Sequence, residues 1–173
     1  SNSAGRMPKK GSVAEPGFDA TTNILGTINL LEAARVAGTK GFVFSSTGGA
    51  VYGEQETFPA DENHRTTPEC PYGVSKRAGE LYLEYYARTF GLSGVALRYA
   101  NVYGPRQNPK GEAGVVAVFT DRLLRGEDLT VNGDGGQTRD FVHVFDVVAA
   151  NIATGKAILA GKVSLERNFT VFN

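Results

Sequence analysis

The chain has 173 residues, of which 41% are hydrophobic and 21% charged, which is ordinary for a globular protein and leaves room for one sizeable core. Its 18 basic and 18 acidic residues cancel, which argues against a nucleic-acid partner because phosphate backbones are bound by basic surfaces. No apolar run approaches the roughly 20 residues of a membrane-spanning helix, and no signal peptide is visible.

The first half of the chain contains one helical and one strand pattern. Residues 1–18 are rich in Gly, Pro and Lys and are expected to form a loop. Between Asp19 and Ala37 apolar residues recur at helical spacing, and Gly38 is a suitable stop. Residues 41–46 form a short apolar run that is typical of a buried strand.

Further helices and strands alternate through the second half. A polar loop leads to a helix predicted from Tyr72 to Phe90, and Val95–Tyr99 is the next strand, followed by a break at Gly104-Pro105. The remaining predicted elements are a helix over 114–125, a strand over 129–131, a helix capped by Asp146 that reaches Leu159, and a strand over 169–172. This alternation predicts an α/β fold with a parallel sheet.

Tyr72 and Lys76 are four residues apart at the start of the predicted 72–90 helix. This spacing places both side chains on one helical face. A lysine ammonium beside a phenol stabilises the phenolate and lowers the phenol pKa from about 10 toward neutrality, which makes tyrosine a usable general base. A hydroxyl from Ser46 or Thr47, at the end of the preceding strand, would hydrogen-bond the same substrate oxygen. The pattern predicts removal of a proton from a sugar or alcohol hydroxyl while hydride leaves the carbon.

The same spacing also has a plainer interpretation. Tyrosine and lysine meet four residues apart in many helices, so Tyr72 can be a half-buried aromatic residue at a helix start and Lys76 a solvated charge. The surrounding segments favour the catalytic interpretation.

Four segments resemble motifs of the extended short-chain dehydrogenase/reductase family, in the family's order. Gly41–Gly53 resembles its strand and active-site loop, and Pro71–Lys76 resembles the start of its catalytic helix. Leu97–Arg106 is similar to its LRYxNVYGPR segment, and Gly133–Val144 to its GdGxqxRDfvhV segment. The chain is identified as a member of the NAD-dependent epimerase/dehydratase branch of this family. The resemblance implies a Rossmann-like parallel sheet flanked by helices, and NAD as the cofactor.

Within the family, the loop Ser45–Ala50 most resembles UDP-glucose 4-epimerases. Related 4,6-dehydratases place an Asp-Glu pair directly after the catalytic threonine, and Gly48-Gly49 stands there instead, which disfavours dehydration. The resemblance implies interconversion of UDP-glucose and UDP-galactose by transient oxidation to a 4-keto sugar, with the hydride carried by NAD. The alternatives are another NAD-dependent sugar-nucleotide epimerase or dehydratase, acting on a uronic acid or an N-acetylated sugar, or an inactive fragment.

The resemblance also implies residue roles. Tyr72 is the acid and base at the sugar 4-hydroxyl, and Lys76 binds the nicotinamide ribose and keeps the Tyr72 pKa low. Thr47 orients the same hydroxyl, with Ser46 as a helper. The further positions implied are cofactor contacts at Asn23, Thr22 (if the alignment is off by one), Ser45, Ser46 and Ala100, and contacts with the nucleotide diphosphate of the substrate at Asn101 and Arg139.

Several of these residues have alternative explanations. Arg139 is next to Asp140, so the two can form a salt-bridged surface pair, and Asn101 can be a strand-end turn residue that bonds its own backbone. His64 and His143 lie far apart without spaced carboxylate or cysteine partners, so no metal is expected. His143 lies in an apolar run and is expected to be a packed core histidine.

An intact family member is expected to begin with a strand, a GxxGxxG turn and a helix that receives the pyrophosphate, and this sequence contains no such motif. Gly133–Gly136 is expected to be a tight turn. We therefore expect an internal segment of a longer enzyme, truncated at the N-terminus and inactive alone. Residues 1–105 would be the C-terminal part of a Rossmann-like domain with the catalytic Tyr and Lys, and residues 106–173 part of a small substrate domain packed on it or interleaved with it.

The implied partners are a nucleotide-diphosphate sugar and a second copy of the chain. The family commonly dimerises through helices that match residues 20–37 and 73–90, so Tyr82, Tyr85 and Tyr86 are expected in the core or at that interface. Cys70 is the only cysteine, which excludes an intrachain disulfide and fits a reducing cytoplasm. Nothing near Cys70 in the sequence suggests a reactive thiol.

Overall fold

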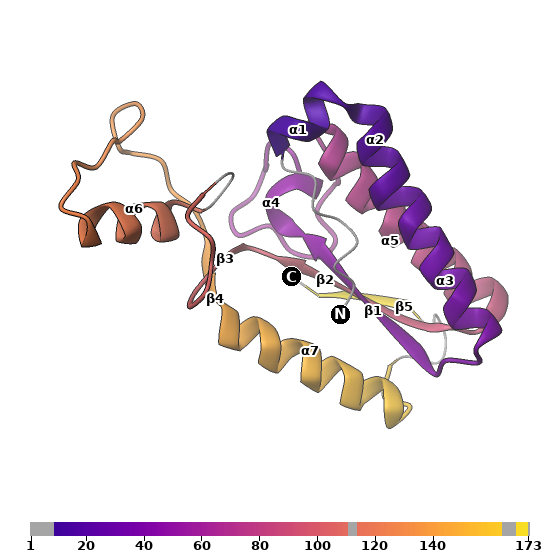
Figure 1. Ribbon diagram of the computed structural model, residues 1–173. Coiled ribbons are helices and arrows are strands. Elements are labelled where there is room, and N and C mark those ends of the chain that lie inside the picture. Colours follow the sequence, from indigo (N-terminus) through magenta and orange to yellow (C-terminus); the bar gives the residue numbers. More distant parts are fainter. Residues whose placement is uncertain (1–8, 111–113, 164–168, 173) are drawn as a thin grey trace.

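The computed structural model describes residues 9–110, 114–163 and 169–172. Its centre is a three-stranded parallel sheet in the order β1 (Gly41–Thr47), β2 (Ser93–Tyr99) and β5 (Phe169–Phe172), as Figure 1 shows. β1 and β2 pair over their whole length, so that Thr47 lies opposite Tyr99 at their carboxyl ends. The predicted parallel α/β sheet is confirmed, and so are its strands at 41–46, 95–99 and 169–172.

Helices cover both faces of this sheet. On one face lie α3 (Gly26–Val36) and α5 (Pro71–Phe90), and on the other lies α7 (Val144–Leu159), as Figure 1 shows. α5 begins with proline at its first position and ends at Gly91, whose φ of 69° is the left-handed conformation that glycine adopts readily. The predicted helix from Tyr72 to Phe90 is therefore confirmed. Among the described residues, no helix is both long and apolar enough to cross a membrane.

The N-terminal region is more helical than expected. Residues expected to be loop instead form α1 (Lys9–Ala14) and the start of α2 (Pro16–Ala20), because side chains such as the fully buried Ser12 pack against α5. A single turn of π-helix, η1 (Thr21–Leu25), joins α2 to α3. The helix predicted over Asp19–Ala37 is thus present, with a wider turn inserted near its start.

The core has one layer on each side of the sheet. Toward α3 and α5 the buried residues are Leu31, Phe44, Leu83, Tyr86, Leu92 and Ala96. Toward α7 the buried residues are Val95, Leu97 and Val163, with Ile158 packed against them. Since neighbouring residues of a strand face opposite sides, β2 contributes Ala96 to the first layer and Val95 and Leu97 to the second.

Two glycines allow α5 to lie close to the sheet. A Cβ at Gly79 would lie 2.5 Å from Cζ of Phe44 on β1, and one at Gly94 would lie 2.7 Å from Cγ of Leu83 on α5. These distances are shorter than any real carbon contact, so only glycine permits this helix–sheet separation.

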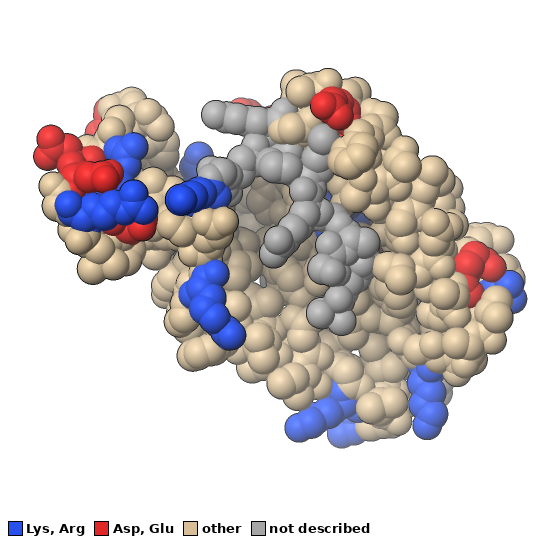
Figure 2. Space-filling view, viewed as in Figure 1, with Lys and Arg blue, Asp and Glu red and all other residues tan. Residues whose placement is uncertain are grey.

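Residues 101–143 form an arm that projects from this body (Figure 1). β3 (Asn101–Tyr103) and β4 (Phe141–His143) pair as a two-stranded parallel ribbon at its base, and α6 (Val115–Leu124) lies within the arm. Charged side chains of both signs gather over the α6 end in Figure 2. The strand predicted over 129–131 is wrong, because these residues are exposed and pair with no strand among the described residues. The tight turn predicted at Gly133–Gly136 is present, with Gly133 and Gly135 at positive φ.

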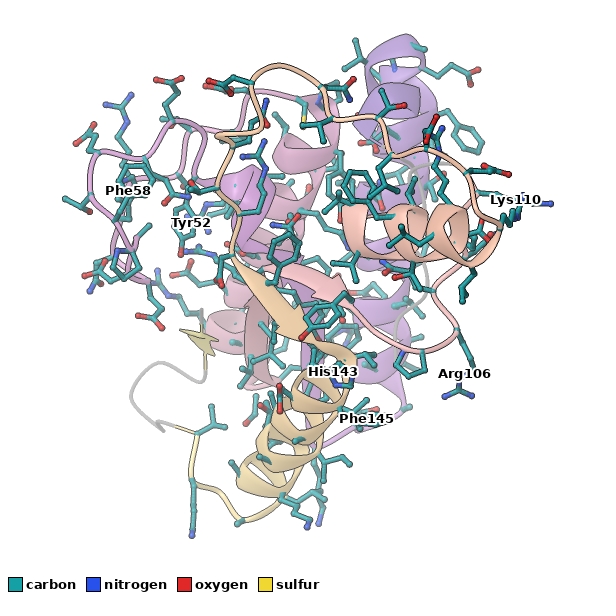
Figure 3. The ribbon with its side chains drawn as sticks, turned by 90° about the vertical axis from the view of Figure 1, so that its left-hand side faces the viewer. Tyr52, Phe58, Arg106, Lys110, His143 and Phe145 are labelled. Atoms are coloured by element: carbon teal, nitrogen blue, oxygen red, sulfur yellow. The ribbon has the colours of Figure 1, made fainter. Side chains whose placement is uncertain are left out.

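The start of α7 differs from the prediction. Asp146 lies in the first turn, and the cap is His143, whose Nδ1 accepts a hydrogen bond of 3.3 Å from the Phe145 amide. His143 is half-buried and lies beside Phe145, as Figure 3 shows, so the expected packed core histidine is wrong. An imidazole nitrogen replaces the usual carboxylate or hydroxyl as the capping acceptor.

Candidate active site

The first turn of α5 presents the predicted Tyr72 and Lys76 on one face. Cys70, in extended conformation, precedes the helix, and Pro71 occupies its first position. The backbone N–H of Tyr72 has no partner within the helix and donates 3.3 Å to Oγ of the buried Ser12 on α1. The N-terminal helix α1, which sequence reasoning took for a loop, thus anchors the start of the candidate site.

Lys76 is buried and directed at the end of β1. It is 7% exposed, and its ammonium donates 3.0 Å to the backbone carbonyl of Ser45. The ammonium lies 5.2 Å from the ring centre of Phe44 and 5.8 Å from that of Tyr72. The interpretation of Lys76 as a solvated surface charge is therefore wrong.

Burial, rather than the Tyr–Lys pair itself, dominates the titration of both groups. Burial lowers the pKa of Lys76, an effect that the Asp19 carboxylate opposes. Burial, followed by the charges of Asp19 and Cys70, raises the pKa of Tyr72. The expectation that Lys76 keeps the Tyr72 pKa low is thus wrong for this structure. Tyr72 is a phenol at neutral pH, the form that donates a proton.

The three hydroxyl residues at the end of β1 point in alternate directions. Ser46 is 4% exposed, and its hydroxyl donates 2.5 Å to Oε1 of Glu80 on α5. Because this hydroxyl is turned to Glu80, the structure does not place it where the resemblance implied, beside Thr47 and the cofactor. The Ser45 hydroxyl lies 3.3 Å from the Tyr99 hydroxyl, and only its carbonyl reaches Lys76. Thr47, half-buried, is the last residue of β1.

Asn23 lies in a buried polar cluster behind the Tyr–Lys pair. Its Nδ2 donates 2.7 Å to Oδ1 of Asp19, and Oδ2 of Asp19 accepts 2.6 Å from the hydroxyl of Ser75, the neighbour of Lys76. Asn23 is 3% exposed, and its Oδ1 has no hydrogen-bond partner among the described residues. Thr22, the alternative position, is half-buried on the same π-helical turn.

The predicted diphosphate residues meet at the base of the arm. The backbone N–H and the Nδ2 of Asn101 both donate to the carbonyl of Asp140, at 3.0 and 2.9 Å. Arg139, which directly precedes Asp140, is exposed and donates 2.6 Å to the Thr138 carbonyl. It forms no ion pair with Asp140 within the described part of the chain. The structure therefore brings Asn101 and Arg139 together, with Ala100 half-buried beside them. Asn101 bonds a distant backbone rather than its own turn.

Two buried charged residues between α5 and the sheet were not predicted from the sequence. Glu80 is fully buried on α5 and Arg98 is 5% exposed on β2, and the two form a salt bridge of 2.7 Å. The available signals were an acid one turn after Lys76 and an arginine inside the apolar run Val95–Tyr99.

A hollow of about 460 Å³ lies along the loop after β1, and its lining includes none of the predicted site residues. Its lining is Glu54, Gln55, Glu56, His64, Arg65, Thr67 and Glu69. Three glutamates to one arginine do not suit a phosphate ligand. In the described ranges, no three His, Cys, Asp or Glu side chains gather as a metal site.

A parallel α/β sheet, with the buried Lys76 and the half-buried Tyr72 beside the carboxyl ends of its strands, defines a Rossmann-like protein, in which nucleotide ligands bind at that edge. Residues 2–164 match the NAD dependent epimerase/dehydratase family. The chain belongs to this family.

Individual relatives share the sequence and the fold. A UDP-glucose 4-epimerase of Mycolicibacterium smegmatis is 47% identical over 152 residues, 88% of this chain and 49% of the relative. The structure of a Thermotoga maritima UDP-glucose 4-epimerase with UDP-glucose is 53% identical, with a TM-score of 0.84 over 86% of this chain and 48% of its own. A Methanobrevibacter ruminantium UDP-N-acetylglucosamine 4-epimerase with UDP-N-acetylmuramic acid is 40% identical, with a TM-score of 0.83 over the same shares. The chain spans about half the length of the curated relatives it matches.

Proposed function

We propose that this chain carries the acid–base part of an NAD-dependent UDP-glucose 4-epimerase, which interconverts UDP-glucose and UDP-galactose. The observation that carries the proposal is the placement of Tyr72 and Lys76 on one face of α5, with Lys76 bonded to the carbonyl of Ser45 two residues before Thr47. The 53% identity to an epimerase whose structure contains UDP-glucose supports this sugar nucleotide.

The residues around Lys76 fit a dinucleotide. A lysine ammonium has three donors, and among the described residues one acceptor, the Ser45 carbonyl, is hydrogen-bonded to it. The buried Oδ1 of Asn23 is an acceptor without a donor in the described part of the chain. We propose that Lys76 and Asn23 bind the nicotinamide ribose side of NAD, with Ala100 against its ring, Thr22 and the Ser45 backbone near by, and Asn101 and Arg139 on the diphosphate of the sugar nucleotide. A guanidinium suits that diphosphate.

The chemistry follows from these placements. When bound, NAD⁺ supplies the hydride acceptor and a positive charge that favours the phenolate form of Tyr72. Tyr72 would accept the proton of the sugar 4-hydroxyl, which Thr47 would orient. Tyr72 would then return this proton to the oxygen of the 4-keto sugar, a step for which its raised pKa is suited.

The principal alternative is another sugar nucleotide. The 40% identity to a UDP-N-acetylglucosamine 4-epimerase supports an N-acetylated sugar. Gly48 and Gly49, which form the start of the short helix α4 (Gly48–Val51), provide neither an acid nor a base for dehydration.

The test is turnover of UDP-galactose. The chain is assayed with NAD⁺ alone, where we expect no activity, and joined to the parts of the Thermotoga maritima enzyme that it does not match, where we expect interconversion with UDP-glucose. In this chimaera Tyr72→Phe should reduce kcat about 10²- to 10⁴-fold, because the acid and base is removed. Tyr82→Phe, on the exposed side of the same helix, is the control and should leave kcat unchanged.

The outcomes separate the candidates. A chimaera that binds NADH and interconverts only the UDP-N-acetylhexosamines would establish the alternative substrate. Equal turnover in wild type and Tyr72→Phe would contradict the assigned chemistry.

We also propose the two-part division of the chain at residue 105. Residues 1–105 include β1, α5, β2 and β3, and residues 106–173 include α6, β4, α7 and β5. The packing of α7 on β1 and β2, and the pairing of β5 with β2, support interleaving of the second part with the first.

A homodimer is the partner we propose besides the nucleotide sugar. Apolar side chains on the outer faces of α2, η1, α3 and α5 are exposed, namely Phe18, Leu25, Leu30, Val74, Leu81, Tyr82, Tyr85 and Phe90, whereas Tyr86 is buried. Figure 2 shows few charged side chains over α2 and α3 away from their ends. Such a face supports pairing with a second copy as a helical bundle. Leu81→Glu should convert the dimer to monomer in sedimentation equilibrium, and an unchanged mass would exclude this face.

A further inference from the structure

Glu80 is the centre of a buried polar cluster between α5 and the sheet. Its Oε1 accepts hydrogen bonds from the Ser46 hydroxyl at 2.5 Å and from Nε of Arg98 at 2.9 Å. Its Oε2 accepts from Nη2 of Arg98 at 2.7 Å and from Nη1 of Arg77 at 2.9 Å. Four donated bonds on a fully buried carboxylate satisfy all of its usual acceptor capacity.

Arg98 extends the cluster to the loop after β1. Its Nη1 donates 2.9 Å to the Tyr52 hydroxyl and 3.4 Å to the Glu62 carbonyl. Tyr52 is 2% exposed and lies inside the loop, on whose outer side Phe58 is 81% exposed (Figure 3). The loop that leads from β1 to Tyr72 is therefore fastened to the same ion pair.

Both charges are retained in this setting. Burial alone would raise the pKa of Glu80, but the hydrogen bonds from Arg98 and Ser46 lower it below its usual value. Burial would lower the pKa of Arg98, and the bonds to Glu80 and Tyr52 raise it instead. The cluster is a fully ionised pair in which every contact is geometrically defined.

Each member of the cluster adjoins a candidate site residue. Ser46 directly precedes Thr47 on β1, and Arg98 directly precedes Tyr99, the residue opposite Thr47 on β2. Glu80 lies one helical turn after Lys76 and two after Tyr72, on the same face of α5. One carboxylate thus joins the three elements on which the candidate chemistry depends.

We propose that Glu80 is a positioning residue, which through Ser46 and Arg98 holds Thr47 at a fixed distance from Tyr72 and Lys76. The proposal rests on the proposed function. We expect removal of the polar cluster to release the carboxyl end of β1 without unfolding the core, because Phe44, Leu83 and Ala96 belong to a separate apolar cluster. Misplacement by about 1 Å costs on the order of 10²-fold in rate, so the effect on catalysis exceeds that on binding.

Ser46→Ala and Tyr86→Phe form a matched pair for the test. Each removes one hydroxyl that donates 2.5 Å to a carboxylate. Ser46 donates to the buried Glu80 near the site, and Tyr86, far along α5, donates to the partly exposed Glu32 on α3. Hydrogen exchange of the 173-residue chain is measured at residues 45–49. We expect exchange at least about tenfold faster in Ser46→Ala and unchanged in Tyr86→Phe.

A second variant keeps the test independent of folding. Glu80→Met with Arg98→Met removes both charges together, so no unpaired charge remains buried, and such pairs often fold well. We expect the same faster exchange at residues 45–49, with protection of Leu83 retained. Unchanged exchange in this double variant and in Ser46→Ala, or an equal increase in Tyr86→Phe, would overturn the proposal.

Turnover supplies the readout that a purely structural role would not change. In the chimaera, Ser46→Ala should lower kcat about 10²-fold with KM unchanged, whereas Tyr86→Phe should leave both unchanged. Equal kcat in Ser46→Ala and wild type would also overturn the proposal. A chimaera without any turnover would count against the proposed function alone, since the exchange measurement decides the positioning of β1 by itself.

Discussion

The body formed by β1, α5 and β2 and the arm formed by residues 101–143 hold their polar groups in opposite ways. In the body, Asp19, Ser46, Glu80 and Arg98 are buried, and each has side-chain partners. In the described part of the arm no residue from 104 to 140 is buried, and Asn101 and Arg139 bond backbone carbonyls.

Because of this difference, the two halves of the candidate site differ in how far their side chains can move. One half is Tyr72 and Lys76 in the body, and the other is Asn101 and Arg139 in the arm. Buried polar groups are restricted to one hydrogen-bonded arrangement, because any other arrangement would bury an unpaired donor or acceptor at a cost of about 1–3 kcal/mol. Exposed groups exchange their partners for water at little cost. The candidate acid–base residues are therefore held in place before a ligand binds, whereas the candidate diphosphate residues are free to adjust to a ligand.

The largest effect is expected for Leu83→Ala in the body. Leu83 is fully buried between α5 and the sheet, so truncation leaves a cavity and should lower the free energy of unfolding by about 2–5 kcal/mol. Urea denaturation followed by circular dichroism measures it. A loss below 1 kcal/mol would mean that the body is not packed as described.

An intermediate effect is expected for Asp19→Asn, behind the Tyr–Lys pair. The Asp19 charge disfavours the phenolate and raises the pKa of Tyr72, so its removal should lower that pKa and shift phenolate formation to lower pH. In the chimaera, the acid limb of turnover should move in the same direction. Absorbance at the phenolate band, with the signal of Asp19→Asn/Tyr72→Phe subtracted, measures the titration.

The matched control is Asp134→Asn in the exposed turn of the arm. It removes the same charge and should leave the Tyr72 titration unchanged. A shift of equal size in both variants would show a general effect of net charge rather than an effect of the buried Asp19 charge.

The smallest effect is expected for Leu124→Ala at the end of α6. Leu124 is 83% exposed, so the same truncation as in Leu83→Ala should change the free energy of unfolding by no more than about 0.5 kcal/mol. A loss of unfolding free energy comparable to that of Leu83→Ala would show that Leu124 is buried in solution. The contrast between the body and the arm would then no longer hold.

The sequence predicted most of the body. Apolar runs and spacing located β1, α5 and β2, and a capping signal located α7. The spacing of Tyr72 and Lys76 correctly predicted their common face. These features depend on local patterns, which a sequence displays directly. The ribbon of β3 and β4 was missed because each strand has three residues, too short for any periodicity, and their pairing joins residues about 40 positions apart.

The errors at the site have a different physical origin. Ser46 was assigned to the site by its neighbour Thr47, but strand alternation turns it to Glu80, a partner 34 residues away. The Tyr72 pKa was predicted from one neighbour, Lys76, whereas burial and Asp19 determine its direction. Correct predictions at both positions would have required knowing which groups surround each side chain. Those surroundings are formed by the packing of segments that are distant in the sequence.

Gly79 and Gly94, the two glycines between α5 and the sheet, also affect the position of Lys76. The bond from Lys76 to the Ser45 carbonyl spans the gap between helix and strand, and Gly79 and Gly94 set the width of that gap. A methyl group added at Gly79 would meet the ring of Phe44, which lies beside the Lys76 ammonium, and one added at Gly94 would meet Leu83 on α5. The position of Lys76 relative to β1 thus depends partly on two residues that have no side chain, which a search for reactive groups would not consider.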